Sequence, residues 1–221
     1  MRRAAILAAG ALLAVGILRA VPAHGSSRAA ALEPASLAHA QTIRARIGAR
    51  YRARGLAVTE ASSTGVVETF ALLTPDLLRT RFLPAGNGIY YAICPVRATC
   101  PYPSRRFARP AADIVTRRLA LELAVKTFLE TTADVVAVSL PTARFTAFIV
   151  EQKELAREVD LRALAKELGG DPTRDLPAPL RRLVDRVTRP RVFLAAGLEP
   201  TPSGRDNWAG VPRWPMSPTS P

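Results

Sequence analysis

The order of the expected elements predicts an α+β fold, with a single domain in which a largely antiparallel sheet packs against helices. Two observations favour this class. The strands come in neighbouring pairs with helices grouped between them, which is typical of α+β folds with the helices on one face. The chain of 221 residues is also 48% hydrophobic. Residues 36–198 can therefore bury one substantial core, and disorder throughout the chain is excluded.

The N-terminal residues 1–23 have the pattern of an export signal. Arg2 and Arg3 precede an uncharged run at residues 4–18, and small residues follow that run. A basic start, a short apolar run and small residues for cleavage define a secretory signal peptide. If the segment is not cleaved, residues 4–23 form a single-pass membrane anchor instead, because the arginine within them can direct its charge to the surface. Both alternatives predict a secreted or otherwise extracytoplasmic protein.

Two further segments lie outside the predicted domain. Residues 24–35 are mostly small and form a linker between the leader and the domain. Residues 199–221 hold six prolines and are expected to form an extended Pro-rich tail. Trp208 and Trp214 lie in this tail, where they would either dock on the domain or contact a partner.

The predicted domain begins with an amphipathic helix from Ser36 to about Arg54. Apolar residues recur there at steps of three and four, and Gly55 is well placed to end the helix. The arginines around the apolar face are candidate contacts for an anionic partner: Arg44, Arg46, Arg50 and Arg52. The interpretation that we favour is simpler, a surface helix whose polar side happens to be arginine.

A block of strands follows this helix. Residues 56–62 and 66–73 flank a Ser-Thr-Gly turn, so they are expected to pair as a hairpin. A second turn at residues 84–88 leads into a third strand at residues 89–94. Residues 95–110 are rich in proline and are expected to form a loop. This loop carries three more candidate contacts for an anion: Arg105, Arg106 and Arg109.

The two cysteines, Cys94 and Cys100, are predicted to form a disulfide. Disulfides persist in the oxidising compartments that an exported protein reaches. The five residues between the cysteines include a proline, and such a segment can bring the two α-carbons within bridging distance. Free thiols and a redox pair are the alternatives, but the spacing differs from the CxxC motif of thiol-exchange proteins.

A long helix is expected from Pro110 to about Glu130. Its charged residues follow at steps of four and alternate in sign: Arg118, Glu122, Lys126 and Glu130. Such a stripe predicts a solvated face with ion pairs within the helix. We therefore do not interpret Glu122 and Glu130 as a catalytic pair.

The remaining elements are two strands, two helices and a last strand. Residues 134–140 and 144–150 are expected to form a hairpin, because both are apolar and a Pro-Thr-Ala turn joins them. Leucine spacing marks a helix at residues 161–168, and a similar pattern marks another at residues 180–187. The last strand is expected at residues 191–195.

The sequence favours a non-catalytic role. The chain has two histidines, His24 and His39, and both precede most of the domain. A Ser-His-Asp triad or a histidine-bound zinc therefore has no base or ligand there, and no nucleotide-binding motif occurs. We expect no catalytic residue, no metal and no cofactor. An enzyme that uses carboxylates or the cysteine pair is the less favoured alternative.

The charge of the chain indicates which partners to consider. Lysine and arginine number 31 against 18 acidic residues, a formal charge of +13. Such an excess is typical of proteins that bind anionic polymers or lipid surfaces, but compositional bias toward arginine is the explanation that we favour. Nucleic acid is not expected, because an exported protein rarely meets it. The sequence thus predicts an exported or envelope-associated binding or structural module whose ligand it does not identify, with an envelope component or an anionic surface as the candidate partner.

Overall fold

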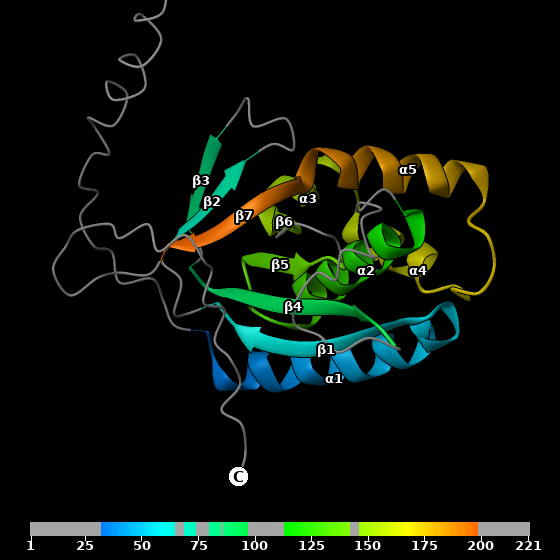
Figure 1. Ribbon diagram of the computed structural model, residues 1–221, viewed down its shortest axis with the longest axis horizontal. Coiled ribbons are helices and arrows are strands. Elements are labelled where there is room, and N and C mark those ends of the chain that lie inside the picture. The colour runs from blue at the N-terminus through cyan, green and yellow to red at the C-terminus, as the bar shows by residue number, and fades with distance from the viewer. Residues whose placement is uncertain are drawn as a thin grey trace, which may run out of the picture.

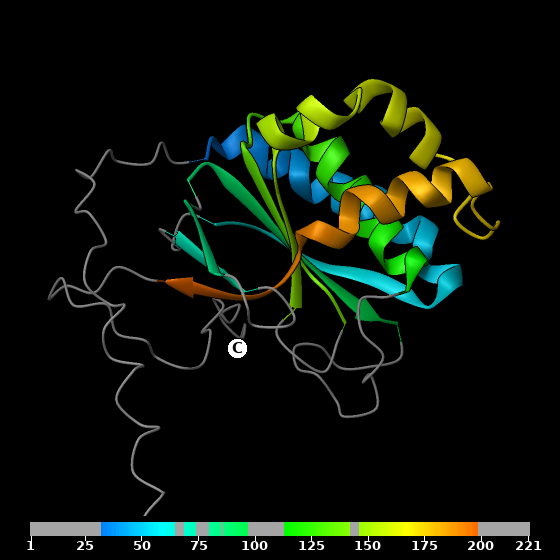
Figure 2. The same ribbon diagram turned by 90° about the horizontal axis from the view of Figure 1, so that it is seen from above.

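The computed structural model describes residues 32–64, 69–73, 80–84, 86–96, 113–141 and 146–198. The predicted leader, most of the linker and the Pro-rich tail lie outside these residues. The described part has two layers, a sheet and a group of helices on one of its faces (Figures 1 and 2). The expected α+β class is therefore confirmed.

The sheet has seven strands in the order β1-β4-β5-β6-β7-β2-β3. Every neighbouring pair is antiparallel except β4 and β5, which are parallel and are joined through α2. A parallel pair requires such a crossover, because its strands run in the same direction. The strands are β1 (Leu56–Ser63), β2 (Thr69–Leu73), β3 (Thr80–Pro84), β4 (Gly88–Pro95), β5 (Val135–Ser139), β6 (Thr146–Glu151) and β7 (Val192–Leu198).

Five α-helices and two short 3₁₀ helices complete the described part. They are α1 (Pro34–Tyr51), η1 (Arg52–Arg54), α2 (Ile114–Glu130), α3 (Gln152–Glu158), α4 (Leu161–Leu168), α5 (Ala178–Thr188) and η3 (Arg189–Arg191). The predicted end of the first helix is confirmed, since Gly55 adopts a left-handed φ of 75° that glycine reaches without strain. The long helix starts later than predicted, after Asp113, whose side chain accepts a hydrogen bond from the Val115 amide.

One predicted hairpin is confirmed and one is wrong. The strands predicted at residues 134–140 and 144–150 pair as β5 and β6. The expected hairpin of residues 56–62 with 66–73 does not form, because β1 pairs with β4 while β2 lies between β3 and β7. Strand β1 pairs with β4 from Leu56 to Ser63, with a register shift between Val58 and Glu60. The short strand β3 and the helix α3 were not predicted.

Helix α2 is the centre of the helical layer. It contacts α1, α4 and α5 on its outer side as well as strands of the sheet. Its polar side is therefore covered too, and the predicted solvated stripe is wrong: Arg118 is 3% exposed and Glu122 is 0% exposed. Toward the end of the stripe Lys126 is half-buried and Glu130 is exposed.

The face of the sheet away from these helices is also apolar. Alternate strand residues belong to a second buried cluster, separate from the core under the helices: Leu72, Leu83, Tyr90, Val135, Ala137, Ala147, Ile149 and Phe193. The sheet thus buries apolar side chains on both faces. No helix in the described part of the chain is long and apolar enough to cross a membrane.

Candidate functional site

A buried polar cluster of Arg50, Tyr51, Arg118 and Glu122 links α1, α2 and α4. The Glu122 carboxylate accepts a hydrogen bond from Arg50 Nη1 at 2.5 Å and another from the Tyr51 hydroxyl at 2.9 Å. Tyr51 is the last residue of α1, and Arg50 precedes it. The carboxylate of α2 therefore holds the end of α1 against the helical layer.

The two arginines of this cluster also bind the C-terminal end of α4. Arg50 Nη2 donates to the carbonyls of Gly169 and Gly170, at 2.9 and 2.5 Å. Arg118 Nη2 donates to the carbonyls of Leu168 and Gly170, at 3.0 and 2.9 Å. The last carbonyls of a helix have no partner within it, so cations that bind them stabilise its end. Each carboxylate and hydroxyl of the cluster already has a partner, which favours a structural role for it.

Burial raises the pKa of two tyrosines of this layer, Tyr51 and Tyr91. The negative charge of Glu122 raises the pKa of Tyr51 further. The Tyr91 hydroxyl lies 2.8 Å from the Thr127 hydroxyl, and both groups are buried. The fold thus favours the neutral phenol at both positions.

We expect the fold to lose stability above pH 10 for this reason. The unfolded tyrosines release their protons near their ordinary pKa of about 10 while the folded ones keep them, so the free energy of unfolding falls by up to about 1.4 kcal/mol per pH unit for each tyrosine. The loss of stability is measured by urea unfolding at several pH values. Tyrosine ionisation is followed by absorbance at 295 nm in the variant Tyr90→Phe/Tyr102→Phe, in which Tyr51 and Tyr91 are the remaining tyrosines. Ionisation of the folded protein near pH 10 would contradict the prediction.

A cavity of about 330 Å³ lies between β6, α3 and the start of β7. Its floor is apolar, with side chains of the second cluster such as Ile149 and Phe193. Charged residues line the rest: Glu151, Glu154, Arg157, Glu158 and Arg191. Several of these charges already have partners, because Glu158 pairs with Arg191 and Glu151 pairs with Lys153. The cavity is suited to a small, largely apolar group, and its charges give no clear preference for a cation or an anion.

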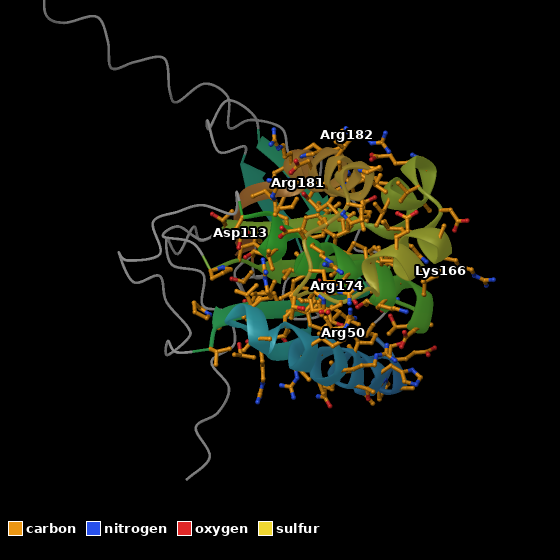
Figure 3. The ribbon with its side chains drawn as sticks, turned by 90° about the vertical axis from the view of Figure 1, so that its right-hand side faces the viewer. Arg50, Asp113, Lys166, Arg174, Arg181 and Arg182 are labelled. Atoms are coloured by element: carbon orange, nitrogen blue, oxygen red, sulfur yellow. The ribbon has the colours of Figure 1, made fainter. Side chains whose placement is uncertain are left out.

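A basic surface lies at the end of the molecule where α1 ends and α5 begins (Figure 1). We call it the basic end and define it by six residues: Arg50, Arg54, Lys166, Arg174, Arg181 and Arg182. Figure 3 views this end directly and shows five of the six labelled on α1, α4, α5 and the segment between α4 and α5. Arg54 belongs to the same end, since its Nη1 donates to the Thr173 carbonyl at 3.2 Å.

Four acidic residues accompany the basic end, and two of them have structural roles. Asp113 caps α2, and Asp171 accepts hydrogen bonds from the Thr173 amide and hydroxyl, at 2.8 and 2.7 Å. Those hydrogen bonds lower the pKa of Asp171. Glu167 and Asp175 are exposed. Of the six cations, Arg50 pairs with Glu122 and Arg174 with Asp171, whereas Arg181 and Arg182 form no ion pair among the described residues.

The four predicted anion contacts of the first helix lie in different environments in the structure. Arg44 donates to the Thr59 carbonyl at 3.1 Å, and Arg46 pairs with Glu130 at 2.7 Å. Arg50 belongs to the buried polar cluster, and Arg52 is exposed next to the basic end. The other predicted contacts, Arg105, Arg106, Arg109, Trp208 and Trp214, lie outside the described residues.

The predicted disulfide has one of its two cysteines in the described part. Cys94 is buried on β4, with its Sγ 3.3 Å from the Thr59 hydroxyl. Cys100 lies outside the described residues, so the Cys94–Cys100 pairing stays a prediction.

The buried polar cluster was missed from the sequence, although one feature pointed to it. Glu122 is the only charged residue between Leu119 and Val125, and an isolated carboxylate within an apolar helical run is seldom left in solvent. The basic end was missed because its residues come from four separate segments of the chain.

Comparisons with protein families, with curated proteins and with solved structures find no match to this chain. Within the described residues, no three histidine, cysteine or acidic side chains gather where they could hold a metal ion.

Proposed function

We propose that this chain is an exported, non-catalytic domain that binds a partner outside the cytoplasm. Two kinds of observation support the proposal. The N-terminal sequence has the pattern of an export signal. In the fold, the two most deeply buried charged side chains of the described residues, Glu122 and Arg118, are engaged in links between helices. That arrangement suits a scaffold for a binding surface better than it suits proton transfer.

The positions at which the described domain begins and ends are the observation that carries this proposal. Helix α1 begins and β7 ends on the same side of the molecule, and the basic end lies on the opposite side (Figure 1). The 18 residues of α1 separate Pro34 from the basic end by about 27 Å, at 1.5 Å per residue. The basic end therefore lies on the side of the described domain opposite the start of α1, the helix that follows the predicted leader and linker (Figure 1).

The test is the location and the N-terminus of the protein in cells that make it. We expect the mature chain in the envelope or secreted fraction. A cleaved leader would leave an N-terminus after residue 23, and an anchored protein would keep residues 1–23 and sediment with membranes. As a control, a variant with aspartate at Leu12 and Leu13 should stay in the cytoplasm, because charges within the apolar run prevent export. Recovery of the unmodified chain only from the cytoplasm, with its leader intact, would overturn the proposal.

A further inference from the structure

We propose that the basic end is a binding surface for a linear anionic polymer, one whose repeating negative groups contact several arginines at once. The inference rests on the proposed function for where the polymer is met, namely in the cell envelope. The binding itself depends only on the described surface and can be tested on the purified protein.

The first support is charge that the fold leaves without a partner. Arg181 and Arg182 are exposed on the second turn of α5, and they form no ion pair among the described residues. Arg174 is 85% exposed and forms a long ion pair with the exposed Asp171, at 3.7 Å. Guanidinium groups pair with phosphate or carboxylate through two parallel hydrogen bonds, so free exposed arginines are suited to such ligands.

The second support is the layout of these charges. In Figure 3 the basic side chains run from Arg181 and Arg182 on α5, past Arg174, toward Arg50 at the end of α1, which is itself paired with Glu122. A row of separate cations is better suited to binding a polymer than to binding one small anion, because each repeating unit of the polymer can contact another arginine. Such contacts add up through the release of counterions from the polymer, and binding then weakens as salt rises.

The start of α5 gives a third, independent argument. This helix has no acidic residue in its first turn and no side-chain cap. Negative groups are favoured near the N-terminus of a helix, so arginines close to it add nothing to the stability of the helix. We therefore expect that Arg181 and Arg182 can be replaced without loss of stability, as is usual for residues that serve binding.

A polymer fits this end better than a membrane surface does. Peripheral membrane binding combines basic residues with large apolar side chains that enter the lipid. Among the described residues, the large apolar side chain exposed near this end is Val96, 49% exposed, whose amide donates to the Gly55 carbonyl. The basic end also lies on the side of the domain opposite the start of α1 (Figure 1).

The test compares three ligands on the purified mature chain: poly(glycerol phosphate), polyglutamate, and vesicles of phosphatidylcholine with 30% phosphatidylglycerol. We expect at least one polymer to bind, with an affinity that falls steeply between 50 and 200 mM salt. Arg181→Gln/Arg182→Gln should weaken that binding about tenfold at low salt and reduce the slope of log affinity against log salt by about 1 for each lost contact. Its melting temperature should stay that of the unmodified chain.

The matched control is Lys153→Gln/Arg157→Gln on α3, which removes the same charge from two exposed side chains away from the basic end. It should leave polymer binding unchanged. Equal losses in both double variants would show attraction by net charge alone and would overturn the proposal. So would the absence of binding to both polymers, or vesicle binding that is as strong as polymer binding and equally sensitive to Arg181 and Arg182. A negative result in this binding test does not change the result of the export test, since the export test measures only where the chain is found.

Discussion

Glu122→Ala is expected to lower the free energy of unfolding by about 3 to 5 kcal/mol, as is usual when one partner of a buried ion pair is removed. The alanine leaves the Tyr51 hydroxyl without its acceptor in a position where water does not reach it. Arg50 also loses its carboxylate, although part of its side chain is exposed and can be hydrated. Urea unfolding followed by circular dichroism measures the loss.

The matched control is Glu130→Ala, two turns further along the same helix. Glu130 also pairs with an arginine of α1, Arg46, but the side chains of that pair are 34% and 52% exposed. Exposed pairs contribute up to about 1 kcal/mol, so this variant should lose little stability. Glu122→Gln should fall between the two, because the amide can still accept from Tyr51 but carries no charge. Equal losses for Glu122→Ala and Glu130→Ala would contradict the structural role of the cluster.

Most individual elements could be predicted from the sequence, because their signals are local. The end of the first helix at Gly55 and the pairing of β5 with β6 depend on residues that are adjacent in the chain. The partners of β1 and β2 could not be predicted, since alternation of apolar residues marks a strand without saying which strand lies beside it. The pairing of β1 with β4 joins residues about 30 positions apart, such as Ser62 and Tyr90.

The candidate surfaces were less predictable for the same reason. Periodicity on α2 indicates one apolar side, but α1, α4 and α5 cover its other side as well, and only the tertiary packing shows this. Glu122 therefore changes from an expected surface charge into the most buried carboxylate of the described chain. The basic end likewise combines residues near position 50 with residues near positions 166–182, which no window along the sequence brings together.

The buried polar cluster also explains how the basic end keeps its shape. Arg50 and Arg118 bind the carbonyls of Gly169 and Gly170, where the segment between α4 and α5 begins. That segment carries Arg174, and it leads into the α5 turn that carries Arg181 and Arg182. The cluster therefore fixes one end of a connection whose charges face solvent, and loosening the cluster should loosen the surface.

Arg118→Met should show this coupling and is expected to cost about 1 to 3 kcal/mol of folding free energy, because a buried carbonyl loses its charged donor. That group is the Leu168 carbonyl, whereas the Gly170 carbonyl keeps its hydrogen bond from Arg50. The loss should be concentrated at the end of α4, so amide exchange there should accelerate more than in β5 or β6. Lys126→Met is the control, a half-buried residue of the same helix that lies two turns further along. It should change neither stability nor exchange by a comparable amount. A uniform acceleration of exchange throughout the domain would instead mean that Arg118 supports the whole core, and the basic end would then have no separate support from the cluster.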